Sequence, residues 1–444
     1  MELTTPITEK ASPKAQKHKG SIASLSAAFF VDTAEEQTLP ILWPHMVASL
    51  GAFLGQLGNI LGISRLVMTL MLPVWGYATD RFSRKKLLVW FTGFWGLWTL
   101  GISFVDSVPQ LLVLRVLSGI GLGVFAPAAF SLISDLFDNE SRGSATGIMR
   151  AIGVFGIILA VIALPILAER GDDGWRMGFA IMGFASFVTG LFMLGIQEPV
   201  RGASEPELRD VISKKRRNQY AFKWSDLWTL FKIPSWRVLL LNEMLTKTAV
   251  IVFTSWNFTL LSELGLEGRN FYMVVFIVFV GLTIGSIFFG WLGDRMERTH
   301  GNRGRILMIQ IGLVATVPAM AGYLLSSGDN LVWLIGFGFV SGTANMAASE
   351  STLWPVAQAI LPPELRGSNR AIINMLVGGV SALPLLLSGT MVDQLGVPTA
   401  LLWFVPLPLL LSALAWLPMF RTYPHDRMAL QRLLVQRREE LLAG

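Results

Sequence analysis

Windows of about 20 residues with few or no charges recur along the whole of this 444-residue chain. A window of that length lets one α-helix cross the hydrocarbon core of a bilayer. Only 15% of the residues are charged and 52% are hydrophobic, whereas an ordinary soluble protein carries about 25% charged residues. The sequence therefore predicts an all-α integral membrane protein.

Hydropathy predicts twelve transmembrane helices in two pseudo-symmetric bundles of six. The first six spans are expected over residues 24–49, 55–79, 87–105, 109–135, 143–168 and 175–197. The second six are expected over 236–262, 270–293, 305–326, 330–359, 367–392 and 398–420. The predicted parts are therefore a cytoplasmic tail (1–23), an N-terminal bundle (24–197), a cytoplasmic linker (198–235), a C-terminal bundle (236–420) and a cytoplasmic amphipathic tail (421–444).

The distribution of lysine and arginine predicts the orientation. With the N-terminus inside, about 29 of the 36 basic residues belong to inside segments, and the outside loops hold three, Arg170, Arg176 and Arg269. Basic residues near the ends of spans are retained on the cytoplasmic side. We therefore expect a multi-pass protein of the cell (inner) membrane with both termini in the cytoplasm.

Two short motifs occur in both halves and in the same order. GYATDR (76–81) is matched by GWLGDR (290–295), and ESRGS (140–144) is matched by ELRGS (364–368). Parallel repeats of this kind place a substrate path at the interface of the two halves, near the bilayer midplane. The pattern favours a transporter built from two equivalent halves.

The loop GYATDRFSRKK (76–86) carries five charges in eleven residues between two apolar runs. A tight charged turn that only fixes orientation would explain its basic residues. The loop also resembles the loop 2–3 signature of the major facilitator superfamily, which implies that superfamily's fold and a latch at the cytoplasmic gate. The gate residues given by the loop and by its repeats are Gly76, Asp80, Arg81, Arg84, Lys85, Arg142, Gly290, Asp294, Arg295 and Arg366.

Within that superfamily the chain most resembles the Spinster-like branch. The similarity lies in GYATDRFSRKKLL followed by FWGLWTLGISF, in LISDLF (132–137) and in EPVRG (198–202). Where that branch usually shows Asp-Arg in span one, this chain has Asp32 with no arginine after it. The resemblance implies transport of lysolipid-like or sphingolipid-like amphiphiles, often linked to protons.

Nine ionisable residues lie inside the predicted spans and away from the span ends. A charge at the bilayer centre costs about 2.5–3.5 kcal/mol, so such side chains normally face the bundle interior or water and pair with one another. They are the candidates for proton coupling and for the substrate cavity: Asp32, Glu35, Glu36, Arg65, Arg115, Arg150, Glu243, Lys247 and Glu350.

Helical spacing groups the acids of span one. Asp32, Glu35 and Glu36 lie at positions i, i+3 and i+4, so they share one helix face. If Arg115 of span four lies opposite them, the acids and the arginine form a switchable pair. Protonating an acid would lower its charge and release the arginine for an anionic substrate.

Span seven carries a second charged pair. Glu243 and Lys247 are four residues apart in the order that favours an ion pair on a helix. A pair that only stabilises span seven is the structural alternative, and Arg65 could likewise reach the membrane surface. Glu350 precedes Pro355 in span ten, where the proline could break the helix and expose backbone.

Several other chemistries find no support in the sequence. There is no cysteine, none of the four histidines stands with carboxylates at metal-ligand spacing, and no phosphate-binding P-loop occurs. We expect no enzymatic activity, no cofactor, no metal and no nucleic-acid partner. The expected partners of a monomer are protons, the lipid bilayer and a small-molecule or lipid substrate.

Together these features predict a proton-coupled secondary active transporter that works by alternating access and moves a lysolipid-like or other amphiphilic small molecule. An organic-anion or drug transporter of the same superfamily is one alternative. A non-transporting membrane sensor or assembly protein is the alternative from another class.

Overall fold

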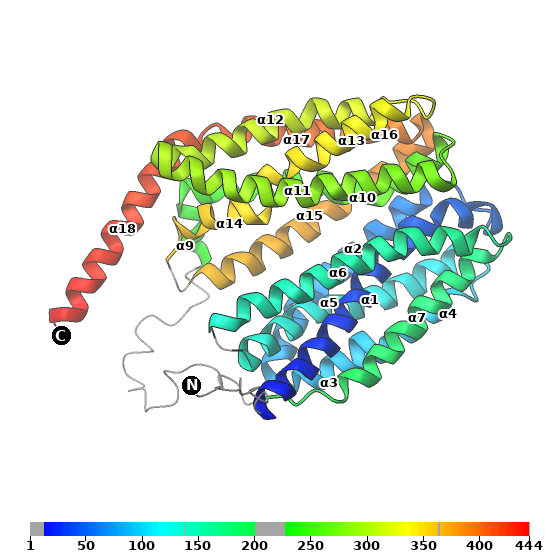
Figure 1. Cartoon of the computed structure of the whole chain (residues 1–444), viewed down its shortest axis with the longest axis horizontal. Coiled ribbons are helices and arrows are strands. Elements are labelled where there is room, and N and C mark those ends of the chain that lie inside the picture. The colour runs from blue at the N-terminus through cyan, green and yellow to red at the C-terminus, as the bar shows by residue number, and fades with distance from the viewer. Residues whose placement is uncertain (1–12, 138, 200–226, 363–364, 444) are drawn as a thin grey trace, which may run out of the picture. The chain divides into compact units, whose positions relative to one another are not determined.

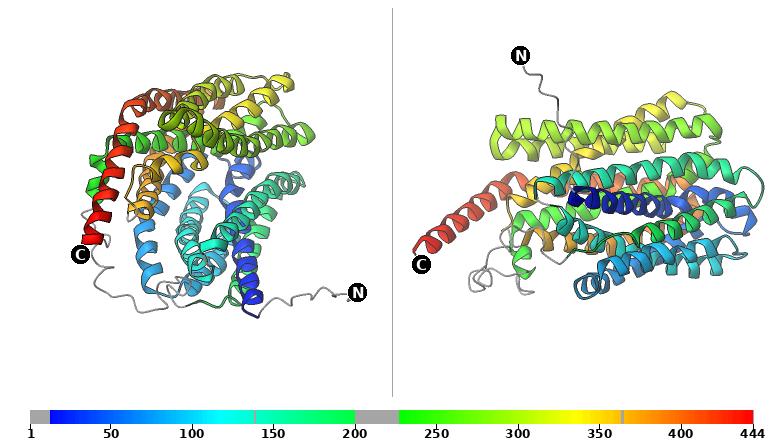
Figure 2. Two further views of the ribbon diagram at one scale, coloured as in Figure 1. Left: turned by 60° about the vertical axis from the view of Figure 1, so that its left-hand side comes forward. Right: turned by 60° about the horizontal axis from the view of Figure 1, so that its bottom comes forward.

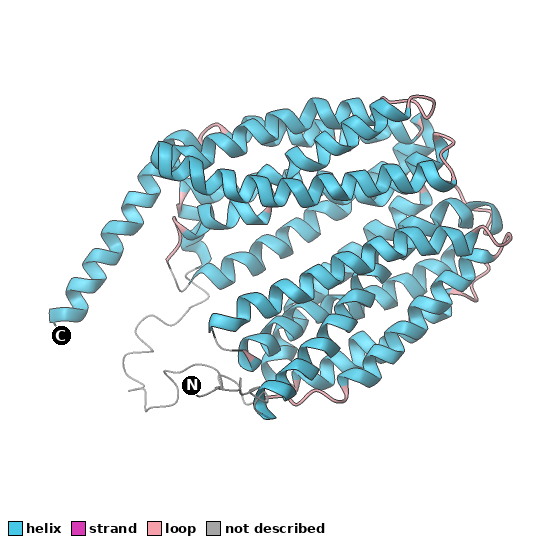
Figure 3. Ribbon diagram, viewed as in Figure 1, coloured by secondary structure: helices cyan, strands magenta, loops and turns pink. Residues whose placement is uncertain are grey.

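The structure, a computed structural model, describes residues 13–137, 139–199, 227–362 and 365–443. Within these ranges the regular structure is helical and no strand occurs (Figure 3). The predicted all-α class is confirmed for this part of the chain.

The first half consists of long helices and one interrupted span (Figure 1). Its elements are α1 (Pro13–Ser49), α2 (Gln56–Arg81), α3 (Arg84–Leu88), the π-helical turn η1 (Val89–Gly93), the 3₁₀ turn η2 (Phe94–Gly96), α4 (Leu97–Ile102), α5 (Val108–Leu136), α6 (Asn139–Ala168) and α7 (Gly174–Met193). The helix α1 is continuous through Pro40 and Pro44.

The second half repeats this pattern of long helices and ends in a separate tail helix. Its elements are α9 (Leu227–Lys232), α10 (Pro234–Glu263), α11 (Gly268–His300), η6 (Gly301–Arg303), α12 (Gly304–Leu324), α13 (Leu331–Asn345), η7 (Met346–Ala348), α14 (Glu350–Gln358), α15 (Arg366–Leu395), α16 (Val397–Phe404), α17 (Pro406–Trp416) and α18 (Met419–Ala443).

Proline and glycine mark several helix ends. Pro109, Pro234 and Pro406 lie in the first turns of α5, α10 and α17, where a missing N–H loses no intrahelical hydrogen bond. Gly265, with φ of 72°, follows α10, and Gly301, with φ of 59°, ends α11. Glycine adopts this left-handed conformation without a Cβ clash, so it stops the helix at these points.

Contacts divide the chain into two compact units, Met1–Leu42 with Leu70–Ile212 and Trp43–Thr69 with Ser213–Gly444. In the first unit, α7 packs against α4 and α6, and α5 packs against α3, α4 and α6. In the second unit, α13 packs against α11 and α12, as Figures 1 and 2 both show, and α10 packs against α15 and α17.

Each unit has its own apolar core. In the first unit it includes Leu25, Phe125 and Met149. In the second unit Leu230 of α9 and Tyr423 of α18 are buried in the core, so the end of the predicted linker and the start of the predicted tail are packed parts of this unit.

Ten helices among the described residues are long and apolar enough to cross a membrane, and they are consistent with the predicted twelve-span fold. The two predicted spans outside this set are 24–49 and 87–105. The first lies within the helix α1, but its three acids lower its hydropathy. The second is divided among α3, η1, η2 and α4, so no single helix reaches membrane length.

The third span leaves regular α-helix where it packs on the backbone of α7. A Cβ atom added at Gly93 would meet Gly190, and one added at Gly96 would meet the side chain of Ser186. The Ser186 hydroxyl donates a hydrogen bond to the Thr92 carbonyl oxygen at 2.7 Å. Only glycine allows two helix backbones to approach this closely.

The tenth predicted span is interrupted at Ser349, which is extended (φ −89°, ψ 173°) between η7 and α14. The sequence allowed a break at Pro355, but Pro355 lies inside α14 and the interruption falls six residues earlier. A proline disturbs the helix at the carbonyl four residues before it. For Pro355 that carbonyl lies in the first turn of α14, so the disturbance falls at the start of this helix.

The start of α2 and the end of α15 meet through their backbones within the second unit. Cβ atoms added at Gly55 or Gly58 would meet the backbone around Gly389. One added at Gly62 would meet the side chain of Leu386 on α15. The Asp393 carboxylate accepts a hydrogen bond from the Gly55 N–H at 2.7 Å. Small residues let the two helices approach closely here.

Candidate functional site

The three acids of α1 occupy one face of a continuous helix in the first unit. Glu35 is buried and accepts a hydrogen bond from the Thr99 hydroxyl of α4. Asp32 is half-buried, and its Oδ1 atom is buried without a hydrogen-bond partner among the described residues. Glu36 is exposed. One helix face therefore carries acids in three different environments.

The helix α5 brings Arg115 to the same group. This side chain is 4% exposed, and its Nη2 atom donates a hydrogen bond to the Glu36 backbone carbonyl oxygen at 3.2 Å. The guanidinium lies within electrostatic range of the Glu35 and Glu36 carboxylates. Within the described part of the chain, Nε and Nη1 have no hydrogen-bond partner. Arg115 thus approaches the acids without a hydrogen-bonded ion pair.

Several hydrogen-bonding atoms in this arrangement have no partner among the described residues. Buried polar atoms in proteins normally have hydrogen-bond partners, and exceptions concentrate where a proton, water or ligand atom binds. Two donors on Arg115 and one acceptor on Asp32 remain unused among the described residues. Such a cluster can take up a proton on an acid and can offer the arginine to an anion.

The other two predicted arginines of the first half lie on different helices from Arg115. Arg150 is exposed on α6 and lies over the Phe130 ring, 5.5 Å from its centroid. Arg65 is half-buried on α2 and belongs to the second unit.

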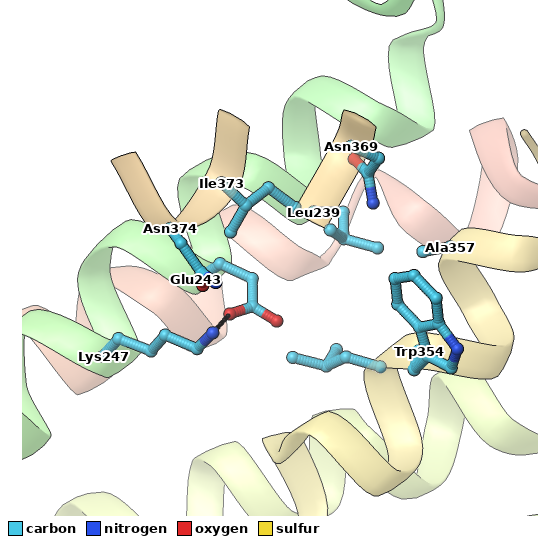
Figure 4. Close-up of a pocket in the computed structure, with 9 residues that line it drawn as sticks. Leu239, Glu243, Lys247, Trp354, Ala357, Asn369, Ile373 and Asn374 are labelled. Carbon is cyan, nitrogen blue, oxygen red and sulfur yellow. Dashed lines mark ion pairs between the residues drawn. The ribbon is translucent and has the colours of Figure 1, made fainter. Parts of the chain in front are cut away.

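The predicted Glu243–Lys247 pair forms on α10, with 2.8 Å between Oε2 and Nζ. Glu243 is buried, and the Lys247 side chain is 31% exposed. The pair borders a pocket between α10, α14 and α15 (Figure 4). Glu350 begins α14, but its side chain lies outside the described residues.

A second kind of charged site lies at the start of the third span. Arg84 begins α3 and is 1% exposed. Its guanidinium pairs with Asp135 at the end of α5 and, at 3.2 Å, with Glu198 after α7. The Ser83 hydroxyl and the Arg84 backbone N–H also donate to the Glu198 carboxylate. One arginine thereby joins three elements.

These contacts act on the Glu198 carboxyl. Burial alone would raise its pKa. The hydrogen bonds from Ser83 and from the Arg84 N–H and guanidinium, together with the arginine charge, outweigh burial and lower the pKa of Glu198 below its ordinary value. Glu198 is therefore held in its charged form.

The second half has a related cluster around Arg305 at the start of α12. This buried guanidinium pairs with Asp294 and, at 3.0 Å, with Glu297, both on α11. Arg427 of α18 reaches Glu297 from the other side at 2.9 Å. Asp426 of α18 also accepts a hydrogen bond from a backbone N–H at the start of α10. The tail helix is thereby fixed to α10 and α11.

The repeated Gly-x-x-x-Asp-Arg motifs have matching surroundings in both halves. The guanidinium of Arg81 lies 5.8 Å from the Tyr77 ring centroid, and that of Arg295 lies 5.4 Å from the Trp291 ring centroid. In each case the aromatic residue is four positions earlier on the same helix face.

The remaining predicted gate residues are less informative. Gly76 and Gly290 face open space, because an added Cβ would meet no atom within 4 Å. Lys85 is half-buried. The side chains of three further gate residues lie outside the described part of the chain: Asp80, Arg142 and Arg366.

Sequence reasoning missed several partners in these clusters. Asp135 and Glu198 lie in LISDLF and EPVRG, segments that carried the family resemblance without a role for either acid. Arg305 lies in the first turn of α12, which begins the third span of the second half, as Arg84 begins the third span of the first half. Comparing the starts of the two third spans would have identified it. Thr99 shows no comparable signal.

Ten helices of membrane length among the described residues, several with acids or arginines inside them, define a multi-pass membrane protein. It belongs to the major facilitator superfamily, whose family model matches residues 25–385. The predicted membership is confirmed.

Individual relatives add detail. A probable 4-methylmuconolactone transporter of Cupriavidus pinatubonensis is 25% identical over 76% of this chain and 75% of that protein. Protein spinster homolog 1 of Bos taurus is 31% identical over 39% of this chain and 34% of that protein. The predicted similarity to the Spinster-like branch is thereby confirmed over part of the chain.

A solved structure shares the fold. The crystal structure of a bacterial homolog of the human lysosomal transporter Spinster, in an inward-facing and occupied conformation, superposes with a TM-score of 0.72. It covers 91% of this chain and 97% of its own, at 17% sequence identity. The two-bundle fold predicted from the repeats agrees with this likeness.

Proposed function

We propose that the protein is a secondary active transporter that couples the movement of an amphiphilic substrate with an oxyanion group to protons by alternating access. The observation that carries the proposal is the cluster of Asp32, Glu35 and Arg115, in which buried donors and a buried acceptor have no partner among the described residues. Buried charges of this kind within a membrane bundle are typical of proton relays and substrate paths.

The coupling step follows from charge balance. With its neighbouring acids ionised, the Arg115 charge is compensated from α1. When an acid takes up a proton, one negative charge is lost and the arginine gains affinity for an anion. Proton uptake and anion binding would therefore favour each other, which is the requirement for coupled transport.

The substrate class has two candidates. A small organic acid comes first, because Arg115 offers its donors to an oxyanion and a relative over most of the chain is named a transporter of a small organic molecule. A lysolipid-like amphiphile is the second, supported by the similarity to the Spinster-like branch. Its headgroup phosphate would use the same arginine.

Transport in proteoliposomes tests the coupling. An imposed proton gradient should accelerate uptake of 3-phenylpropionate or of a lysophospholipid by the natural protein, and Asp32→Asn or Glu35→Gln should remove the dependence on the gradient. Asp172→Asn, the same chemical change at an exposed position, should keep it. If the natural protein moves substrate at the same rate with and without the proton gradient, proton coupling is rejected.

We also propose that both termini face the cytoplasm of an inner-membrane protein. The chain contains no cysteine, so a single introduced cysteine reports its side without background. A membrane-impermeant thiol reagent added to whole cells should label Asp172→Cys and leave Lys86→Cys unlabelled. The reverse labelling pattern would contradict this orientation.

A further inference from the structure

The second unit contains a pocket that the coupling cluster does not use. Three helices line it on three sides: Leu239, Glu243 and Lys247 from α10, Leu353, Trp354 and Ala357 from α14, and Asn369, Ile373 and Asn374 from α15 (Figure 4). The residues from α10 are spaced by four, so they form one helix face that is apolar at one end and charged at the other.

Asn369 provides an unused donor in this pocket. Its side chain is 1% exposed, and its Oδ1 atom accepts a hydrogen bond from the Trp236 indole N–H at 2.5 Å. That bond fixes the amide so that the other end, Nδ2, is directed toward the pocket (Figure 4). Nδ2 has no hydrogen-bond partner among the described residues. A buried amide donor left unused in this way costs free energy, which a ligand acceptor would recover.

Lys247 provides a charged donor at the other end. Its ammonium already holds a carboxylate, that of Glu243, at 2.8 Å. Glu243 is buried, whereas the Lys247 side chain retains 31% exposure, so a ligand can approach the ammonium. The resident carboxylate demonstrates that the geometry around this ammonium accepts a carboxylate oxygen.

The pocket also has an apolar wall. Trp354 lies across it from Glu243 and Lys247 (Figure 4). Leu353 and Ile373 also line the pocket. The enclosed space is about 30 Å³, enough for about two water-sized groups. The pocket therefore has room for an oxyanion group, and the rest of a substrate would lie at its open side.

We propose that this pocket binds the oxyanion end of the transported substrate. The oxyanion, a carboxylate, sulfonate or phosphate, accepts hydrogen bonds from Lys247 Nζ and Asn369 Nδ2, and the adjoining apolar part lies against Trp354. Glu243 acts as a built-in competitor that occupies the ammonium when no substrate is bound. The assignment of the bound molecule as cargo rests on the transport function proposed above, but binding itself does not.

Equilibrium binding to the purified full chain in detergent tests the proposal without any gradient. The probe is 3-phenylpropionate, and 3-phenylpropanamide is the neutral probe of the same shape. The carboxylate should bind saturably and the amide at least about tenfold more weakly, because it loses a charge-assisted hydrogen bond.

Three conservative variants assign the contacts. Lys247→Gln should weaken carboxylate binding by about tenfold or more, and Asn369→Asp, which keeps the Trp236 bond but removes the donor, should do the same. Glu243→Gln should tighten it by about two- to fivefold, the worth of a partly exposed ion pair. Tighter binding cannot arise from misfolding. Lys232→Gln, an exposed change on α9 away from the pocket, is the matched control and should leave the affinity unchanged.

The outcomes separate this proposal from the transport function. Any of three results would overturn it. The first is equal binding of the carboxylate and the amide, and the second is the lack of saturable carboxylate binding at millimolar concentrations. The third is an affinity of Lys247→Gln and Asn369→Asp within about twofold of that of the natural protein. Proton-driven transport together with that result would leave the proposed function intact. The expected binding pattern without gradient-driven transport would reject the function and leave this site standing.

A competition experiment distinguishes the two sources of the oxyanion. Displacement of 3-phenylpropionate by lysophosphatidate, lost in Lys247→Gln, would support the pocket as a site for a lipid phosphate. If Lys247→Gln weakens binding of 3-phenylpropionate but lysophosphatidate does not displace this probe, the result would support the pocket as a site for small organic acids.

Discussion

Arg84 and Arg305 occupy corresponding places in the two halves of the chain. Each is buried at the start of the third span, shortly after a Gly-x-x-x-Asp-Arg motif, and each pairs with two acids. Their partners, however, come from different places. Arg84 joins the ends of α5 and α7 to α3, whereas Arg305 meets two acids of a single neighbouring helix, α11.

The difference follows from the length of one helix. The helix α2 ends at Arg81, the last residue of its motif, whereas α11 continues past its motif to His300. That extra length places Glu297 one turn after Asp294, where it pairs with Arg305 and also with Arg427 of α18. The first half is thus fastened by its own spans, and the second by an extension and a tail helix.

The acids also differ in exposure. Asp294 is 58% exposed at its side chain, whereas Asp135 is 11% exposed. Removing an arginine from buried acids leaves uncompensated charge, but exposed acids are rehydrated. The same motif position should therefore contribute unequally to stability in the two halves.

The largest expected effect is that of Arg84→Ala. It removes the positive charge that Arg84 places beside Asp135 and Glu198 and should lower the free energy of unfolding by about 3–5 kcal/mol. Unfolding followed by circular dichroism in a denaturing detergent measures it. Lys86→Ala, an exposed neighbour, should stay within about 0.5 kcal/mol of the natural protein. A loss below about 1 kcal/mol for Arg84→Ala would remove the basis of the comparison.

Arg305→Ala should have a smaller effect, because water can reach Asp294 once the guanidinium is gone. We expect a loss of about 1.5–3 kcal/mol in the same assay, the range for hydrogen bonds to charged groups. A loss equal to that of Arg84→Ala would show that exposure of the acids does not distinguish the two clusters.

Acid should affect the first cluster through Glu198. Because its pKa is lowered in the folded state, this group contributes stability above its ordinary pKa of 4.5, and that contribution is lost as the pH falls through the lower folded value. The difference in unfolding temperature between the natural protein and Glu198→Gln should therefore be full near neutrality and shrink below pH 4.5. A difference that stays constant down to strongly acidic pH would contradict this sign.

Arg427→Ala should have the smallest effect on global stability, about 0.2–1 kcal/mol, because this ion pair is partly exposed. The local effect should be larger. Amide hydrogen exchange in α18 should speed up, whereas exchange in α7 should not change. Unchanged exchange in α18 would show that Asp426 and the buried Tyr423 hold the tail helix without Arg427.

The sequence was sufficient for features set by periodicity along one helix. Apolar windows predicted the ten helices that are long and apolar enough to cross a membrane. The spacing of Asp32, Glu35 and Glu36 placed them on one face because α1 is helical there. The Glu243–Lys247 bond was predicted for the same reason. The two spacing inferences need only neighbours within about one helical turn, and the apolar windows need only one continuous segment of about 20 residues.

Features set by packing between helices were not predictable in this way. The broken third span depends on Gly93 meeting Gly190, almost one hundred residues away. The Thr99 hydroxyl reaches Glu35, and Asn369 faces the pocket, only because of how distant helices are arranged. The roles proposed for the acids and arginines of both units remain predictions for the experiments above.

The glycine contact between α2 and α15 has a consequence for which residues these positions can hold. A Cβ atom at Gly55, Gly58 or Gly389 would overlap the main chain of the other helix, so alanine at any of them would push the two helices apart. The hydrogen bond from the Gly55 N–H to the Asp393 carboxylate would then lengthen as well. At this crossing even the smallest side chain is too large.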